Sequence, residues 1–98
     1  YYLKLMRNII NSLIEKVIIP QYGDLSYHVF GTNHFPRSPY PLGYGYIVEF
    51  QDISPEIQNQ LGKDVKMILE MLGLQHVSYV YNLDFRGVLE VYGIQKDV

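Results

Sequence analysis

Two helical patterns, each followed by two strand patterns, constrain the fold of this 98-residue chain more than any other feature. Apolar residues recur every three or four positions from Leu5 to Ile18 and again from Ile57 to Leu72, which is the period of a helix with one buried face. The two patterns align at an offset of 52 residues, with Leu5, Ile9, Leu13 and Val17 matching Ile57, Leu61, Val65 and Leu69. The length favours a single domain, with candidate repeat halves 3–52 and 53–98.

The ends of both helices have local signals. Pro20 disfavours helical geometry at the residue before it, so we expect the first helix to end near Ile18 or Ile19. Ser54 and Pro55 suit the N-cap and first position of the second helix. Gly73 suits the left-handed residue that follows its end, and Gly62 in the middle favours close packing.

Four segments have the alternation or β-branched and aromatic content of strands, namely 25–30, 44–50, 77–83 and 88–94. Residues 31–43 contain three prolines and two bounding glycines and predict a long loop. The order helix, strand, strand, repeated once, predicts an α+β fold: two αββ halves that form a four-stranded antiparallel sheet with two helices on one face.

The composition excludes several classes of function. The chain has no Cys, Trp or Ala, so disulfides, thiolate metal sites and cysteine chemistry are impossible. It contains no apolar run long enough to span a membrane, and its net charge of −2 with scattered Lys and Arg disfavours nucleic acid. We expect a cytoplasmic protein without a cofactor.

The ten tyrosines are the most informative feature for function, because most of them fall in strands. Apolar and aromatic residues occupy both faces of the predicted sheet, and two helices cover only one face. This predicts a homo-oligomer, most simply a dimer, because exposed apolar patches mark contacts. The candidate interface residues are Phe30, Tyr44, Tyr46, Tyr79 and Tyr81. One alternative is a monomer with a tyrosine-rich surface, and another is stacking of single-stranded nucleic acid on Tyr44, Tyr46, Tyr79 or Tyr81.

The segment from His34 to Tyr44 is the candidate binding loop for an unknown protein partner, with His34, Arg37 and Tyr40 as its candidate residues. Its PxxP spacing suits an extended conformation that docks on an aromatic groove. The alternative is a stiff surface connection whose prolines lower the entropy of the unfolded chain.

No catalytic or metal-binding residue is predicted. His28, His34 and Asp24 lack the short spacing of converging metal ligands. A less favoured alternative is a metal-dependent nuclease that uses acidic residues. Its candidate carboxylates are Asp24, Glu49, Asp52, Asp64 and Glu90. The leading interpretation is therefore an interaction protein that is not an enzyme.

The N-terminal segment Tyr1-Tyr2-Leu3-Lys4-Leu5-Met6-Arg7-Asn8-Ile9-Ile10 and the Tyr-, Ile- and Asn-rich texture resemble small orphan proteins of crenarchaeal filamentous viruses. The resemblance implies a thermostable viral protein made in the cytoplasm of a host that lives in hot acid. That group shares no functional motif, so the resemblance implies no site residue.

Overall fold

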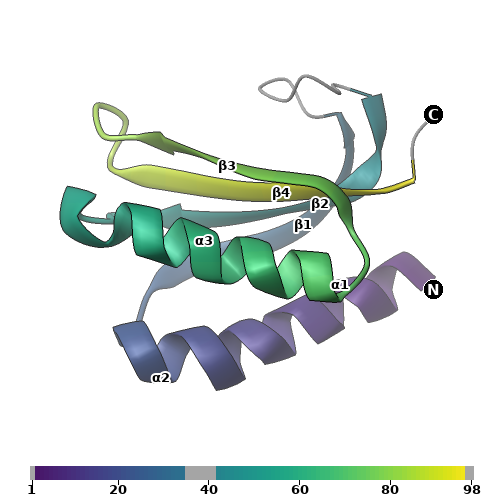
Figure 1. Ribbon diagram of the computed structural model, residues 1–98, viewed down its shortest axis with the longest axis horizontal. Helices are drawn as coiled ribbons and strands as arrows, with labels where there is room; N and C mark the ends of the chain where they lie inside the picture. The colour runs from purple at the N-terminus through teal and green to yellow at the C-terminus, as the bar shows by residue number, and fades with distance from the viewer. Residues whose placement is uncertain (1, 35–41, 97–98) are drawn as a thin grey trace.

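Four antiparallel strands form one sheet in the order β1-β2-β4-β3, and both helical segments lie on the same face of it (Figure 1). The computed structural model describes residues 2–34 and 42–96. The elements are α1 (Tyr2–Leu13), the π-helical turn η1 (Ile14–Ile18), α2 (Ile19–Tyr22), β1 (Ser26–His34), β2 (Leu42–Gln51), α3 (Pro55–Met71), β3 (Gln75–Asn82) and β4 (Val88–Lys96). The predicted α+β fold of two αββ halves is confirmed.

The first helix does not end before Pro20, so that expectation is wrong. The π-helical turn precedes the proline, and the Ile19 N–H bonds the carbonyl of Ile14 five residues back. Because this wider turn displaces the preceding carbonyls from their α-helical positions, the Pro20 ring fits and α2 continues to Tyr22. The turn also compensates for helical drift, so that Ile10, Ile14 and Ile18 all remain buried.

The second helix has the predicted ends. Ser54 occupies the N-cap position with Pro55 after it, although the Ser54 side chain makes no capping hydrogen bond. At the other end Gly73 has a φ of 89°, and the Leu74 N–H bonds the carbonyl of Leu69 at 3.1 Å. This is the Schellman arrangement, and Leu74 completes it by packing into the core.

The strands are longer than predicted, and the connection between β1 and β2 is correspondingly shorter. Residues 31–34 belong to β1 and residues 42–43 to β2, since their backbones pair. The register of β2 against β4 shifts between Tyr44 and Gly45, because the extra residue Gln95 lies in β4. Tyr44 is 49% exposed, whereas Tyr46 and Phe50 are fully buried.

The core lies between the helical segments and one face of the sheet. Both inner strands supply fully buried side chains, namely Tyr46, Val48, Phe50, Leu89 and Val91. Gly62 of α3 allows the close approach to β3, because a Cβ there would lie 2.6 Å from the Tyr79 ring. The predicted role of Gly62 in close packing is confirmed.

Tyr22 links the two helical segments to each other. Its hydroxyl donates a 2.6 Å hydrogen bond to Asp64 of α3. Burial, followed by this hydrogen bond and the negative charge of Asp64, raises the pKa of Tyr22 to about 12. The helical segment that packs on β1 is therefore joined to the helix that packs on β3 and β4.

Candidate functional site

The sheet face opposite the helices, here called the open face, carries a row of apolar side chains. Phe30, Ile47 and Tyr92 are direct neighbours across β1, β2 and β4. Ile47 and Val80 pack against a small cluster of Tyr92 and Ile94, which are 7% and 2% exposed. Phe30, Ile47 and Val80 are half-buried. The second face of the sheet thus carries apolar residues, as the strand patterns predict, although their side chains are half-buried or buried.

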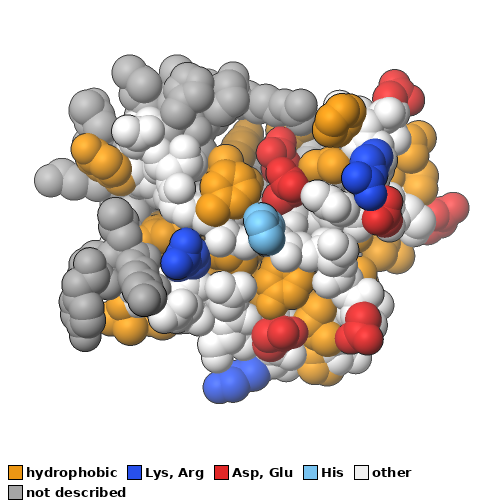
Figure 2. All heavy atoms as spheres, turned by 180° about the vertical axis from the view of Figure 1, so that it is seen from behind, with side chains coloured by type: hydrophobic (Ala, Val, Ile, Leu, Met, Phe, Trp, Pro, Cys, Tyr) orange, Lys and Arg blue, Asp and Glu red, His pale blue; other side chains and the backbone are white. Residues whose placement is uncertain are grey.

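An acidic row lies beside the apolar row, and the view from behind shows acidic side chains next to hydrophobic ones (Figure 2). Glu49 of β2 is directly opposite Glu90 of β4, and His28 of β1 is opposite Glu49. Like charges on directly opposed residues destabilise a strand pair. Glu49 accepts a 3.3 Å hydrogen bond from the Gln51 amide. Among the described residues, no three His, Asp or Glu side chains converge as metal ligands would.

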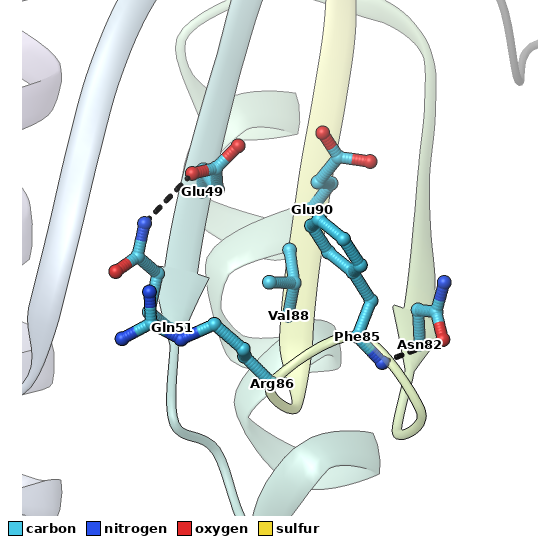
Figure 3. A pocket seen from close by; sticks show the side chains of 7 residues that line it. All are labelled: Glu49, Gln51, Asn82, Phe85, Arg86, Val88 and Glu90. Atoms are coloured by element: carbon cyan, nitrogen blue, oxygen red, sulfur yellow. Dashed lines mark hydrogen bonds between the residues drawn. The ribbon is translucent and has the colours of Figure 1, made fainter.

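A shallow hollow of about 190 Å³ opens where the acidic row meets the turn between β3 and β4 (Figure 3). Its lining residues are Glu49, Gln51, Asn82, Phe85, Arg86, Val88 and Glu90. Figure 3 shows that the lining side chains come from β2, the end of β3, β4 and the turn. The exposed Phe85 ring gives the hollow an apolar wall beside its carboxylates.

Backbone hydrogen bonds hold this turn against the end of β2. Asp52 and Ile53 donate their N–H groups to the carbonyls of Arg86 and Gly87, at 2.9 and 3.0 Å. Gly87 has a φ of 59°, and a Cβ there would lie 2.6 Å from the Ile53 oxygen, so the position requires glycine. The ion pair between Arg86 and Asp52, at 3.9 Å and largely exposed, contributes little.

The predicted interface residues do not form one surface. Tyr46 is fully buried beneath the helices, which removes it from any interface of the folded chain. Tyr79 and Tyr81 also point to the helical side, and their hydroxyls donate to Asn59 and to the Ile53 carbonyl. Only Phe30 lies on the open face, and Tyr44 is exposed at the end of β2.

This placement also bears on the nucleic-acid alternative. A stacking platform needs exposed rings, and Tyr46, Tyr79 and Tyr81 instead pack with the core. The open face presents Glu49 and Glu90, whose charges repel phosphate.

The candidate binding loop falls mostly outside the described residues. Arg37 and Tyr40 are not among them. His34 is described only as the last residue of β1. The predicted loop therefore stays a prediction.

The remaining carboxylates of the nuclease alternative lie apart from the open face. Asp64 accepts hydrogen bonds from Tyr22 and Gln60. Asp52 pairs with Arg86, and Asp24 is exposed in the turn before β1. Only Glu49 and Glu90 are brought together.

A second set of apolar side chains is exposed on the helical layer. Leu5, Ile9 and Val17 of α1 and η1 are between 37% and 47% exposed, and Met67 and Met71 of α3 are 60% and 81% exposed. The wide apolar stripe of the first helix is therefore only partly buried. No described helix is long and apolar enough to cross a membrane.

The outer strands have a feature that the sequence did not reveal until the strand order was known. Neither β1 (Ser26–His34) nor β3 (Gln75–Asn82) contains Asp, Glu, Lys, Arg or Pro. The strand charges are instead on the inner strands, at Glu49, Glu90 and Lys96. Monomeric sheets usually protect their edges with charges, prolines or bulges. The two outer edges here lack the first two protections.

The sequence and the fold were compared with known proteins. No family model matches the chain, and comparison with curated proteins and with solved structures found no similar protein.

Proposed function

We propose that this chain is a small interaction protein without catalytic activity, and that it associates with itself through its sheet. The observation that carries the proposal is the pair of outer strands without a charged residue or proline. Such edges offer unpaired backbone N–H and C=O groups to another strand, and a second copy of the chain presents the same edges in a symmetric pair.

The apolar row on the open face supports the same function. Phe30 at the β1 edge continues into Ile47 and Tyr92, so a strand added at this edge would extend an apolar surface that already exists. Aromatic and aliphatic side chains of this kind are enriched at the centres of interfaces. The viral origin implied by the resemblance in texture is a separate proposal that specifies no residue.

Sedimentation equilibrium over a wide range of protein concentration tests self-association. We expect a concentration-dependent mass that rises from the 11.5 kDa of one chain toward twice that value. A mass of one chain at every concentration up to the millimolar range would contradict the proposal.

A further inference from the structure

We infer that β1 is the strand through which two copies associate, and that the two β1 strands pair antiparallel about a twofold axis at Phe30. The result is one eight-stranded sheet with all helices on the same face. This inference rests on the self-association proposed above and specifies its edge, partner and register.

The two outer strands differ in how regularly they pair with their inner neighbours, and this difference favours β1 as the strand that pairs with a second copy. Near the end of β1, Thr32 pairs with Gly45 and the next pair is His34 with Leu42. Between these two pairs β1 advances by two residues and β2 by three. The extra residue therefore belongs to the inner strand, and β1 pairs without interruption from Ser26 to Thr32. In β3 the extra residue lies on the outer strand, between Gln75 and Ser78, where His76 has a φ of 52°. A bulge of this kind twists an edge and shortens what a partner can pair with.

The β1 sequence is compatible with pairing to itself. A twofold axis normal to the sheet at Phe30, the central residue of β1, places Val29 opposite Gly31 of the second copy and His28 opposite Thr32. Directly opposed residues in an antiparallel pair share a face, so the open faces of the two copies become continuous. No two charges are opposed at the new contact, because β1 has none.

This register also joins the apolar rows. In each copy Phe30 is the outermost member of the row that continues to Ile47 and Tyr92. With Phe30 on the axis, the two rings lie side by side, and the two rows form one band across both sheets. Aromatic cross-strand pairs stabilise antiparallel strands. The acidic rows with Glu49 and Glu90 lie off the axis.

Lysine substitutions at matched positions of the two outer strands test which edge is used. Phe30 and Val80 are both half-buried on the open face. Phe30→Lys places two like charges on the axis, and we expect dimerisation to weaken roughly 100-fold or more. Val80→Lys should leave the dissociation constant nearly unchanged. Far-ultraviolet circular dichroism checks that both variants are folded.

Cysteine scanning tests the register without relying on loss of function. The natural chain has no Cys, so each variant from His28→Cys to Thr32→Cys has a single thiol. Only the residue on the axis is opposed to itself, at a Cα separation that suits a disulfide. We expect air oxidation to cross-link Phe30→Cys faster than any neighbour. A maximum elsewhere in β1 overturns the register.

The outcomes separate this inference from the proposed function. A wild-type chain that is monomeric at all concentrations overturns both. A wild-type dimer that Val80→Lys or Met71→Lys disrupts, while Phe30→Lys does not, overturns the β1 edge and leaves self-association standing. Loss of dimer in Phe30→Lys alone, with cross-linking greatest at position 30, supports the inference.

Discussion

The inner and outer strands of this sheet reverse the usual distribution of charge. Inner strands β2 and β4 supply the most buried side chains and also carry Glu49 opposite Glu90. Outer strands β1 and β3 carry no charge, although edges are where charge normally prevents unwanted pairing. The buried side chains that stabilise the sheet are therefore concentrated at its centre, whereas its edges are where we propose that it associates.

The largest expected effect distinguishes the buried centre from the edge. Phe50 of β2 is fully buried, so Phe50→Ala should lower the free energy of unfolding by about 3–5 kcal/mol. The matched change Phe30→Ala removes a half-buried ring at the edge and should cost less than about 2 kcal/mol. Urea unfolding of both variants measures the difference, and equal losses would contradict the division between centre and edge.

A smaller effect tests how the outer strand β3 is held. Gly62→Ala would place a Cβ 2.6 Å from the Tyr79 ring, so α3 and β3 have to separate. We expect a loss of about 1–3 kcal/mol in the free energy of unfolding. The neighbouring change Lys63→Ala is exposed and should stay within about 0.5 kcal/mol. Urea unfolding again measures both, and a neutral Gly62→Ala would show that the contact is loose.

Alkaline pH tests the link between the helical segments that cover the two outer strands. The pKa of Tyr22 is raised from 10.0 to about 12, so its protonated form is favoured in the folded state. Its stabilising contribution is fully present below pH 10 and is lost as the pH rises from about 10 through about 12. The advantage of the wild type over Tyr22→Phe in thermal unfolding should therefore shrink over that range. An advantage that stays constant would argue against the Tyr22–Asp64 hydrogen bond.

Tyr27 of the outer strand β1 is a second tyrosine whose pKa is raised in the folded state. Burial and then the nearby Glu15 carboxylate raise the pKa of Tyr27. Tyr27→Phe should likewise reduce the sensitivity of the fold to pH above 10.

The smallest expected effect has the opposite sign and concerns the inner strands. Glu49→Gln removes the like charge opposite Glu90 and keeps an oxygen that can accept from Gln51. We expect stabilisation by about 0.5 kcal/mol at neutral pH and low salt, and less at high salt. Thermal unfolding at two ionic strengths measures it. A destabilised variant would show that the Glu49 charge has a stabilising partner.

Much of the fold follows from local patterns. The period of the helices, the signals at Ser54, Pro55 and Gly73, and the alternation in 44–50 all act over a few residues. The end of the first helix could not be predicted from Pro20, because the π-helical turn relieves the clash by which a proline normally ends a helix. Tyr44 shares the alternation of Tyr46 and Phe50 in the sequence, yet it is exposed while they are fully buried, and periodicity alone does not show this difference.

The candidate interface was harder to predict, because the number of tyrosines does not specify where they point. Tyr79 and Tyr81 lie on either side of Val80, so the pattern places apolar or aromatic residues on both faces of β3. In the structure α3 packs on β3, and the two hydroxyls donate to Asn59 and to the Ile53 carbonyl. The open face instead carries Phe30, Ile47 and Tyr92, of which only Phe30 was among the predicted residues.

The sequence by itself determined the element types and the two-layer class, because helical and strand periodicities are local properties of the chain. Only the tertiary structure decided which strands are central and which are outermost, since hydrogen bonding between distant segments sets the order β1-β2-β4-β3. Because of that order, the uncharged segments Ser26–His34 and Gln75–Asn82 are the outer strands, whose edges lack protecting charges. An uncharged strand is common in the middle of a sheet, where its backbone is paired on both sides. At the edge, its unpaired N–H and C=O groups can bind another strand.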